Sequence, residues 1–368
     1  MILRAIGPPT SGTLAAIMVL LLAIAGCSES EAQSPAVPPL RLIALGYEEL
    51  VSPSTDLGEL AQRFADVGAT GVGITAGRAD WTTFRWEGHE ERWAAPLRQG
   101  ERDPFDEAVR VLGRDRHVSA VVDVFAPELL ASEPDLAAVD EHGSPSDEQV
   151  SISGLTRGEH GDRLLEMIAQ LSARDDVDSI DLTELHYDQY GFGADDLELY
   201  QEYTGSPDWP RDADGDVDLA DAELGQWRSA EIGAFVARAA EVAHGYGKEL
   251  FVDVRVSWDR LSDNSRDNGQ DYEVLLEHAD RLVVWNYFGL TGAGPEVTDE
   301  LTQHLADLGA ERFIHSVGLW TGDEGQVSAS DLAAALEIAE ANGIHDAWIT
   351  PLGMIENDHW DALRSEWR

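Results

Sequence analysis

A short acidic stretch in the middle of the chain holds the residues best suited to chemistry. The segment SIDLTELHYDQYGFG (residues 179–193) contains Asp181, Glu184, His186 and Asp188. Neighbouring carboxylates can exchange protons with a substrate, because burial and like charge bring their pKa values toward the working pH. We predict Glu184 as a general acid/base, Asp181 as a group that stabilises charge or orients a substrate, and Asp188 as a further catalytic carboxylate.

These acids lie within a regular alternation of strand and helix patterns. Strands are predicted at 41–46, 71–75, 118–127, 178–185, 250–257, 281–288, 312–320 and 346–355. Helical spacing is present at 56–68, 103–114, 157–173, 226–247, 270–279, 297–309 and 329–343. Eight strands separated by helices predict a (β/α)8 TIM barrel, formed as a single domain over residues 41–368. The alternative, an open doubly wound sheet, lacks a glycine-rich phosphate loop after its first strand.

A barrel would bring the acids to one opening, because its active site lies at the C-terminal ends of the strands. Strand alternation points Asp181 and Thr183 toward the barrel axis, with Asp253 and Arg255 on the next strand. We therefore expect a buried ion pair between Asp181 and Arg255. The alternative is that these charged residues form only a satisfied polar plug. Glu184 follows at the rim, where functional residues concentrate.

Aromatic residues mark several of the predicted strand ends. They are Trp81, Trp258, Trp285, Tyr287 and Trp320. A sugar can stack its C–H faces on such rings while its hydroxyls bond to carboxylates and amides. We expect these aromatics to bind a sugar, and core packing is the alternative for part of them. The other predicted substrate contacts are His186, Tyr187, Asp253, Arg255 and Asn286.

The segment around the fourth strand resembles a known family. Residues 176–193 (DVDSIDLTELHYDQYGFG) and 200–205 (YQEYTG) are similar to the corresponding region of the family-10-like glycosyl hydrolases of bacterial lipoproteins. The resemblance continues at 225–236 (GQWRSAEIGAFV) and 281–290 (RLVVWNYFGL), and it spans most of 41–355. It implies a TIM barrel with glycosidase activity on an extracellular polysaccharide. A more distant resemblance is to the hydrolase domain of poly-N-acetylglucosamine-processing lipoproteins.

Three positions depart from the family patterns. Thr183 occupies the strand-end position where the family has Asp, and Glu184 follows one residue later. His186 stands where the family has Arg. Family 18 chitinases have acids at alternating positions, which in this chain are Asp181, Thr183 and Leu185. The position of the catalytic acid therefore differs by one residue from the family pattern.

Most glycosidases use two carboxylates, and the sequence offers more than one candidate for the second carboxylate beside Glu184. The predicted seventh strand, 312–320, contains no acid. Three possibilities follow: a partner from Asp253 or Asp259, a rim pair of Glu184 with Asp188, or participation of a substrate N-acetyl group beside one strong acid.

The N-terminus has the pattern of a secretory signal. Arg4 precedes an apolar run, and Ile24-Ala25-Gly26-Cys27 follows it. Small residues before a cysteine resemble the lipobox of bacterial lipoproteins. This resemblance implies that residues 1–26 form a cleaved signal peptide and that Cys27 carries a lipid anchor. The alternative, a transmembrane anchor, requires a longer apolar run. Residues 27–40 would form a flexible tether, leaving the protein on the extracytoplasmic face of the cell membrane.

The composition excludes some partners and suggests others. The net charge is −45 and Lys248 is the only lysine, which argues against nucleic acid as a partner. Cys27 is the only cysteine, so the chain cannot form an intramolecular disulfide. We expect no cofactor, with one candidate exception in the segment DADGDVDLADAE. Its acids have the spacing of a calcium-binding loop: Asp212, Asp214, Asp216, Asp218 and Glu223. Val217 occupies the position that requires glycine, so an acidic surface loop is the alternative.

These features together predict a glycoside hydrolase of the cell envelope that cleaves an amino-sugar or neutral polysaccharide internally. Thr183 keeps a second possibility open, a noncatalytic carbohydrate-binding barrel. A third is an envelope assembly protein that binds no sugar.

Overall fold

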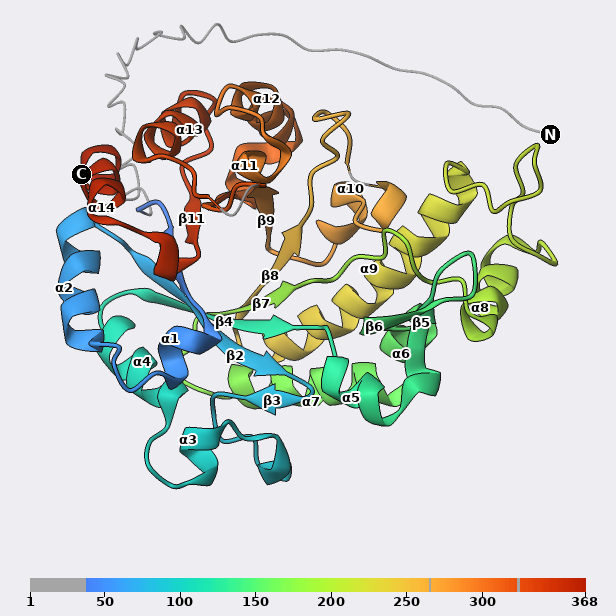
Figure 1. The fold of residues 1–368 in the computed structure, drawn as a ribbon, viewed down its shortest axis with the longest axis horizontal. Coiled ribbons are helices and arrows are strands. Elements are labelled where there is room, and N and C mark those ends of the chain that lie inside the picture. The colour runs from blue at the N-terminus through green and yellow to red at the C-terminus, as the bar shows by residue number, and fades with distance from the viewer. Residues whose placement is uncertain (1–37, 265, 323–324) are drawn as a thin grey trace, which may run out of the picture. The chain divides into compact units, whose positions relative to one another are not determined.

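The computed structural model describes residues 38–368 except 265 and 323–324 (Figure 1). The predicted signal peptide, Cys27 and most of the predicted tether lie outside the described residues. Eight parallel strands form a closed ring, because β1 pairs with both β2 and β11. The strands of the ring are β1 (Arg41–Leu45), β2 (Gly71–Arg78), β4 (His117–Asp123), β7 (Ser179–Thr183), β8 (Glu249–Val254), β9 (Arg281–Asn286), β10 (Phe313–Gly318) and β11 (Ala347–Thr350). The predicted (β/α)8 barrel is confirmed.

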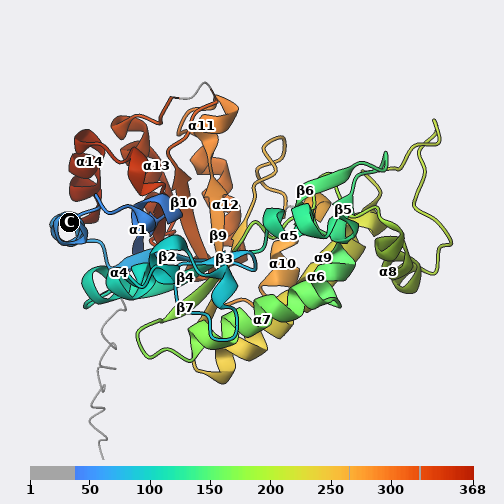
Figure 2. The ribbon, with the colours of Figure 1, turned by 60° about the horizontal axis from the view of Figure 1, so that its bottom comes forward.

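Helices surround the ring of strands (Figures 1 and 2). They are α2 (Leu57–Val67), α4 (Pro104–Leu112), α7 (Glu159–Ser172), α9 (Ala222–Gly245), α10 (Tyr272–Leu275), α12 (Val297–Gly309), α13 (Ala329–Ala341) and α14 (Asn357–Trp367). Helix α4 illustrates how the sequence forms them. Asp103 caps its first turn by accepting the backbone N–H of Asp106, and Pro104 occupies the first position. Phe105 and Leu112 on its inner face are fully buried.

Further elements extend the loops at the C-terminal ends of the strands. They are α1 (Tyr47–Val51), β3 (Trp81–Thr82), η1 (Glu90–Arg92), α3 (Ala95–Arg98), α5 (Pro127–Ser132), η2 (Pro134–Leu136), β5 (Ala137–Val139), β6 (Pro145–Val150), α6 (Ile152–Thr156), α8 (Ala194–Thr204), η3 (Arg266–Asn268) and α11 (Phe288–Thr291). The connections η4 (Ala310–Arg312) and η5 (Leu352–Met354) complete the chain. Strands β5 and β6 form a separate antiparallel hairpin that lies near α5 and α8 to one side of the barrel (Figure 2). Most of these extensions were not predicted, because their strands and helices are too short for a clear periodicity.

The lower part of the barrel interior is apolar. Its inward side chains form a cluster of Leu42, Phe251, Val283, Ile314 and Trp348, all at least 96% buried. Gly73 on β2 makes room for the Trp348 indole, because a Cβ atom there would lie 2.1 Å from the ring. The interior below the strand ends is thus filled, and the indole of Trp348 provides a floor for the space above it.

Most of the predicted strands end earlier in the structure than in the sequence pattern, and the differences are large at β4 and β8. Strand β4 ends at Asp123, whose carboxylate accepts the backbone N–H of Phe125 in a turn that leads to α5. Strand β8 ends at Val254, so Arg255 lies beyond the ladder and is not held by strand alternation.

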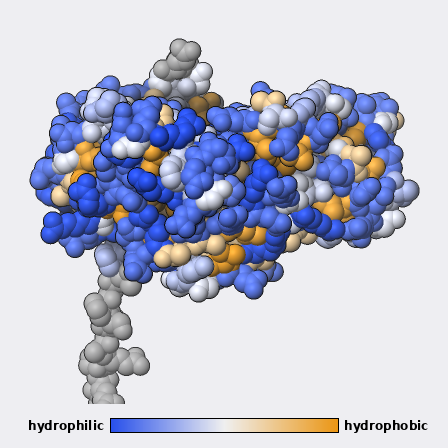
Figure 3. Space-filling view, turned by 90° about the horizontal axis from the view of Figure 1, so that it is seen from below, coloured by the Kyte–Doolittle hydropathy of each residue, from blue (hydrophilic) through white to orange (hydrophobic). Residues whose placement is uncertain are grey.

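The surface agrees with the acidic composition. Hydrophilic residues predominate on the face shown in Figure 3, and apolar residues form separate patches on it. Among the described residues, no helix has the length and apolar character needed to cross a membrane.

Candidate active site

A cavity of about 510 Å³ opens at the C-terminal ends of the barrel strands, and we call it the central pocket. It contains seven of the residues predicted from the sequence: Asp181, Glu184, Asp253, Arg255, Trp285, Tyr287 and Trp320. Trp348 and Ser316 also line it. The closed barrel therefore brings Asp181, Glu184 and Asp253, but not the predicted catalytic acid Asp188, to one opening with part of the predicted aromatics.

Glu184 lies directly after the last residue of β7, in a conformation that non-glycine residues rarely adopt. Its φ is +61°, in the left-handed region. Strict alternation would turn Glu184 away from the side on which Thr183 lies, yet both residues line the central pocket. The left-handed turn thus directs the Glu184 side chain into the pocket. About one third of this side chain is exposed, so it remains accessible to a ligand.

Asp181 and Asp253 lie deeper, and burial controls their protonation. Asp181 is fully buried and neither of its carboxyl oxygens has a hydrogen-bond partner among the described residues. Burial, with a contribution from Asp253, raises the pKa of Asp181 well above its usual value. Burial also raises the pKa of Asp253 to about 7, and the charge of Glu184 adds to this shift. Interactions with Thr183 and Trp285 partly oppose it. Burial thus favours the protonated form of Asp181, and Asp253 is poised to exchange a proton near neutral pH.

The predicted ion pair between Asp181 and Arg255 is wrong. Arg255 donates instead to Asp188, and its Nη1 lies 3.4 Å from Nδ1 of His186. The reason is that β8 ends before Arg255, so the side chain turns to the rim. Asp188 thus lies at the rim, where it holds Arg255.

His186 connects this rim cluster to Glu184. Its Nε2 is 3.1 Å from a Glu184 carboxylate oxygen. Since the Arg255 guanidinium can only donate, Nδ1 of His186 is the acceptor and Nε2 carries the hydrogen directed at Glu184. The chain from Asp188 through Arg255 and His186 therefore orients the Glu184 carboxylate.

The aromatic side chains of the central pocket form a continuous wall. The rings of Trp285 and Tyr287 stack with centroids 5.3 Å apart and an interplanar angle of 10°. Trp320 lies 5.4 Å from Tyr287 in a tilted arrangement. Tyr287 is partly buried beside Ser316, and burial raises the pKa of its hydroxyl well above the usual value. These three rings offer a surface on which a sugar can stack beside the carboxylates.

Five predicted substrate contacts do not line the central pocket. His186 lies behind Glu184, Trp81 lines another cavity, and the other three pack elsewhere. Tyr187 is buried in the hydrophobic core and its hydroxyl donates to the backbone oxygen of Val150, 2.7 Å away. Asn286 points from β9 into the helical layer, where its amide nitrogen is 2.7 Å from Thr298 of α12. Trp258 is partly buried against the core. Alternation explains Asn286, because neighbouring strand residues face opposite sides and Trp285 takes the inward one.

Sequence reasoning also missed a buried residue that joins the two acid-bearing strands. Gln270 is 1% exposed, and its side-chain nitrogen donates to the backbone oxygens of Leu185 and Asp253, each 2.9 Å away. Its side-chain oxygen accepts the backbone N–H of Arg255 at 2.8 Å. The contact joins residues far apart in the chain, so no local pattern signals it.

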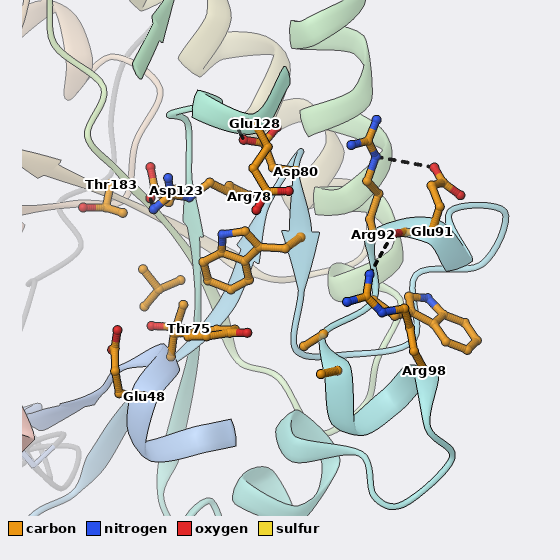
Figure 4. A pocket seen from close by; sticks show the side chains of 16 residues that line it. Glu48, Thr75, Arg78, Asp80, Glu91, Arg92, Arg98, Asp123, Glu128 and Thr183 are labelled. Carbon is orange, nitrogen blue, oxygen red and sulfur yellow. Dashed lines mark hydrogen bonds and ion pairs between the residues drawn. The ribbon is translucent and has the colours of Figure 1, made fainter. Parts of the chain in front are cut away.

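A second cavity of about 520 Å³, the distal pocket, adjoins the central pocket (Figure 4). The predicted sugar-binding residue Trp81 lines this cavity. Asp123 at the end of β4 forms an ion pair of 2.9 Å with Arg78. Burial raises the pKa of Asp123 to about 7, while Arg78 lowers it and Glu184 adds to the increase. Asp123 and Arg78 were not predicted, although Asp123 occupies a strand end and could have been recognised by that position.

The candidate calcium loop is not assembled as a metal site. Among the described residues, no group of three or more histidine, cysteine, aspartate or glutamate side chains is arranged to hold a metal ion. One Asp212 carboxylate oxygen instead accepts the backbone N–H groups of Asp214, Gly215 and Asp216 at 2.9–3.1 Å. The segment is an acidic turn stabilised by its own backbone. Asp259, a candidate second carboxylate, is 81% exposed next to Arg260.

Several solved structures with a similar fold are domains of carbohydrate-degrading enzymes. The PgaB (BpsB) glycoside hydrolase domain from Bordetella bronchiseptica has a TM-score of 0.69 and 17% identity, covering 90% of this chain and 99% of its own. The catalytic domain of beta-amylase from Paenibacillus polymyxa has a TM-score of 0.63 and 11% identity, covering 90% and 98%. The endo-1,4-beta-mannanase from Rhizomucor miehei has a TM-score of 0.56 and 10% identity, covering 90% and 94%.

No protein-family model matches the sequence, and no curated protein matches it. At these identities the likeness is one of fold. The chain thus has the barrel found in these carbohydrate-active domains, as its resemblance to glycosyl hydrolases implied.

Proposed function

We propose that the protein is a glycoside hydrolase that cleaves a polysaccharide at the central pocket. The observation that carries the proposal is the placement of Glu184 and Asp253 in one cavity beside three aromatic rings. The two carboxylates interact electrostatically and differ in burial. Differently placed carboxylates are what glycosidic hydrolysis requires, since one must carry a proton while the other carries charge.

The environments of the two carboxylates suggest a division of roles. Asp253, with its pKa near 7, would donate a proton to the leaving oxygen as the glycosidic C–O bond breaks. Glu184, which accepts the hydrogen bond from His186, would oppose the positive charge that develops at the anomeric carbon and would take a proton from the water molecule that adds to this carbon. Sequence reasoning favoured Glu184 for the proton transfer. The deeper burial of Asp253 supports sharing the acid/base work between the two residues.

Asp181 would act through Asp253. Burial and the neighbouring Asp253 raise the pKa of Asp181 well above its usual value, so its neutral form is favoured beside Asp253. Arg255 and Asp188 would position Glu184 through His186.

The composition of the two pockets supports an amino-sugar polymer as the substrate class. The distal pocket alone is lined by five carboxylates, namely Glu48, Asp80, Glu91, Asp123 and Glu128. Three guanidinium groups, those of Arg78, Arg92 and Arg98, face them. The excess of carboxylates would attract an ammonium group more strongly than a carboxylate group.

Release of reducing ends from a panel of polysaccharides tests the proposal. The panel contains partially acetylated chitosan, chitin, a neutral glucan and a polyuronate. We expect release from chitosan with the wild-type protein and a loss of about a thousandfold with Glu184→Gln. Glu223→Gln in the exposed acidic loop is the matched control and should keep full activity. Binding of a polysaccharide without release of ends would instead support a noncatalytic carbohydrate-binding barrel, and an absence of both would indicate an assembly role.

We also propose that the protein is anchored at Cys27 on the extracytoplasmic face of the cell membrane. The support is the signal-like N-terminal pattern. Metabolic labelling with a radioactive fatty acid tests it. The full chain should incorporate label and fractionate with membranes, whereas Cys27→Ala should not be labelled. Labelling of the variant would contradict the proposal.

A further inference from the structure

The distal pocket and the central pocket form one continuous depression. Thr75, Val121 and Thr183 line both cavities. In Figure 4, Thr183 and Asp123 lie at one side of the distal pocket, while Arg92 and Arg98 lie at the opposite side. A ligand bound in the central pocket can therefore extend past Thr183 into the distal pocket and stay in contact with the protein.

The distal pocket has its own stacking surface. The Trp81 ring lies 4.5 Å from the Tyr47 ring, tilted by 58°. The guanidinium of Arg78 lies 5.4 Å from the centroid of the Trp81 ring. These contacts fix the orientation of the indole, so a ligand would meet a ring that is already ordered.

Polar groups occupy the junction between the pockets. Asp123 and Thr183 are register partners on neighbouring strands β4 and β7. Asp123 is fixed by Arg78 and also accepts the backbone N–H of Phe125 at 2.8 Å. A carboxylate and a hydroxyl at adjacent strand ends can accept and donate hydrogen bonds to the hydroxyls of a sugar that crosses the junction.

The outer wall of the distal pocket is formed by the extension after β2. Strand β3 pairs with β2, and the backbone N–H of Ala94 donates to the oxygen of Thr82 at 2.8 Å. The indole N–H of Trp93 donates to the oxygen of Trp86 at 3.0 Å. The wall is thus tied to the barrel by main-chain contacts and does not depend on a ligand for its shape.

We propose that the distal pocket is a second sugar subsite, with Trp81 as its platform, that binds another residue of the same amino-sugar chain. The identity of the ligand rests on the proposed function, whereas the continuity and the aromatic platform do not. The subsite makes binding depend on chain length: a long chain occupies both pockets, and a short one occupies the central pocket alone.

Titration calorimetry with chitosan oligosaccharides of two and six residues tests the inference. All proteins are full chains carrying Glu184→Gln, so that the ligand is not consumed. We expect the six-residue chain to bind about tenfold more tightly than the two-residue chain. Trp81→Ala should remove this advantage and leave the affinity for the two-residue chain within about twofold.

Two further variants keep the test independent of folding defects. Ala95→Trp fills the distal pocket from an exposed position at the start of α3, leaving Trp81 and Tyr47 in place, and it should have the same effect. Tyr246→Ala removes an aromatic side chain that is 53% exposed on the surface, and it should change neither affinity.

The outcomes separate the inference from the proposed function. Length-dependent binding that requires Trp81 would support the subsite even if the wild-type protein released no reducing ends. Equal affinities for both chain lengths, or equal losses for both in Trp81→Ala, would overturn the subsite even if the wild-type protein cleaves chitosan. Absence of binding of either chain would also overturn it.

Discussion

Residues 181–188 and 212–223 are both rich in carboxylates, and the fold gives them different surroundings. Asp181 is fully buried beneath the central pocket, beside Asp253 on the next strand. Asp212, Asp214 and Asp216 are exposed in a turn, where the Asp212 carboxylate accepts hydrogen bonds from backbone N–H groups. Both segments would titrate alike in an unfolded chain. The comparison teaches that a high density of acids does not by itself shift their pKa values toward the working pH. Burial close to other carboxylates does.

The largest difference between the two regions should appear in kcat/KM when a buried Asp and an exposed Asp are each replaced by Asn. Asp253→Asn is expected to lower kcat/KM on chitosan by about a hundredfold to ten-thousandfold, because proton donation is lost. Wild-type kcat/KM should also fall above about pH 7, where Asp253 loses its proton. The residual activity of the variant should lack this fall. Asp218→Asn is the control and should behave like the wild type, and an equal loss in both variants would contradict the comparison.

The same substitution should change the dependence of stability on pH. Asp253 has a pKa of about 7 in the folded chain, against an ordinary value of 3.8. The folded chain therefore holds this proton more firmly, so ionisation lowers the free energy of unfolding as pH rises from about 4 to 7. Asp253→Asn removes this loss, about 1.4 kcal/mol for each pH unit.

Denaturant unfolding at several pH values measures this effect. The variant should be more stable than the wild type above pH 7 by a few kcal/mol, and the difference should vanish toward pH 4. A difference that is constant across this range would show that Asp253 is not held in its protonated form by burial. Asp218→Asn again provides the control.

Gln270 provides a second contrast between the two regions, because its buried side chain bonds to the ends of both acid-bearing strands. The acidic turn, residues 212–223, is instead held by hydrogen bonds within its own segment. Gln270→Ala leaves the backbone oxygens of Leu185 and Asp253 without this donor, and we expect a loss of about 1–3 kcal/mol in the free energy of unfolding. Activity should fall by about tenfold, since the ends of β7 and β8 are less fixed. Gln201→Ala, which removes an exposed contact with Pro207, is the control.

The smallest effect is expected in the acidic turn. Changing Asp212, Asp214, Asp216 and Asp218 together to Asn should keep activity and alter the free energy of unfolding by less than about 0.5 kcal/mol, because Asn can accept the same backbone hydrogen bonds. Addition of calcium should not raise the Tm of the wild-type protein. A calcium-dependent increase in Tm, lost in the fourfold variant, would establish the turn as a metal site.

Much of the architecture could be predicted, because strands and helices of this barrel are long enough to show their periodicity. The same reasoning correctly placed Asp181, Glu184, Asp253 and Trp285 at one opening. It failed where the chain leaves regular structure. Arg255 was expected to face inward, but it lies one residue beyond β8 and turns to Asp188. Tyr187 was expected at the site, but it lies beyond β7 and packs into the core.

The sequence by itself determined the alternation of strands and helices, the inward direction of Asp181 and the placement of the acids after the fourth strand of the ring. These properties depend on residues close together in the chain, so local periodicity carries them. Only the tertiary structure decided that Asp253 is the acid beside Glu184, that Gln270 holds their strands together and that Trp81 belongs to an adjoining pocket. Those relations join segments distant in sequence, and the desolvation that shifts a carboxyl pKa exists only once the barrel has closed around it.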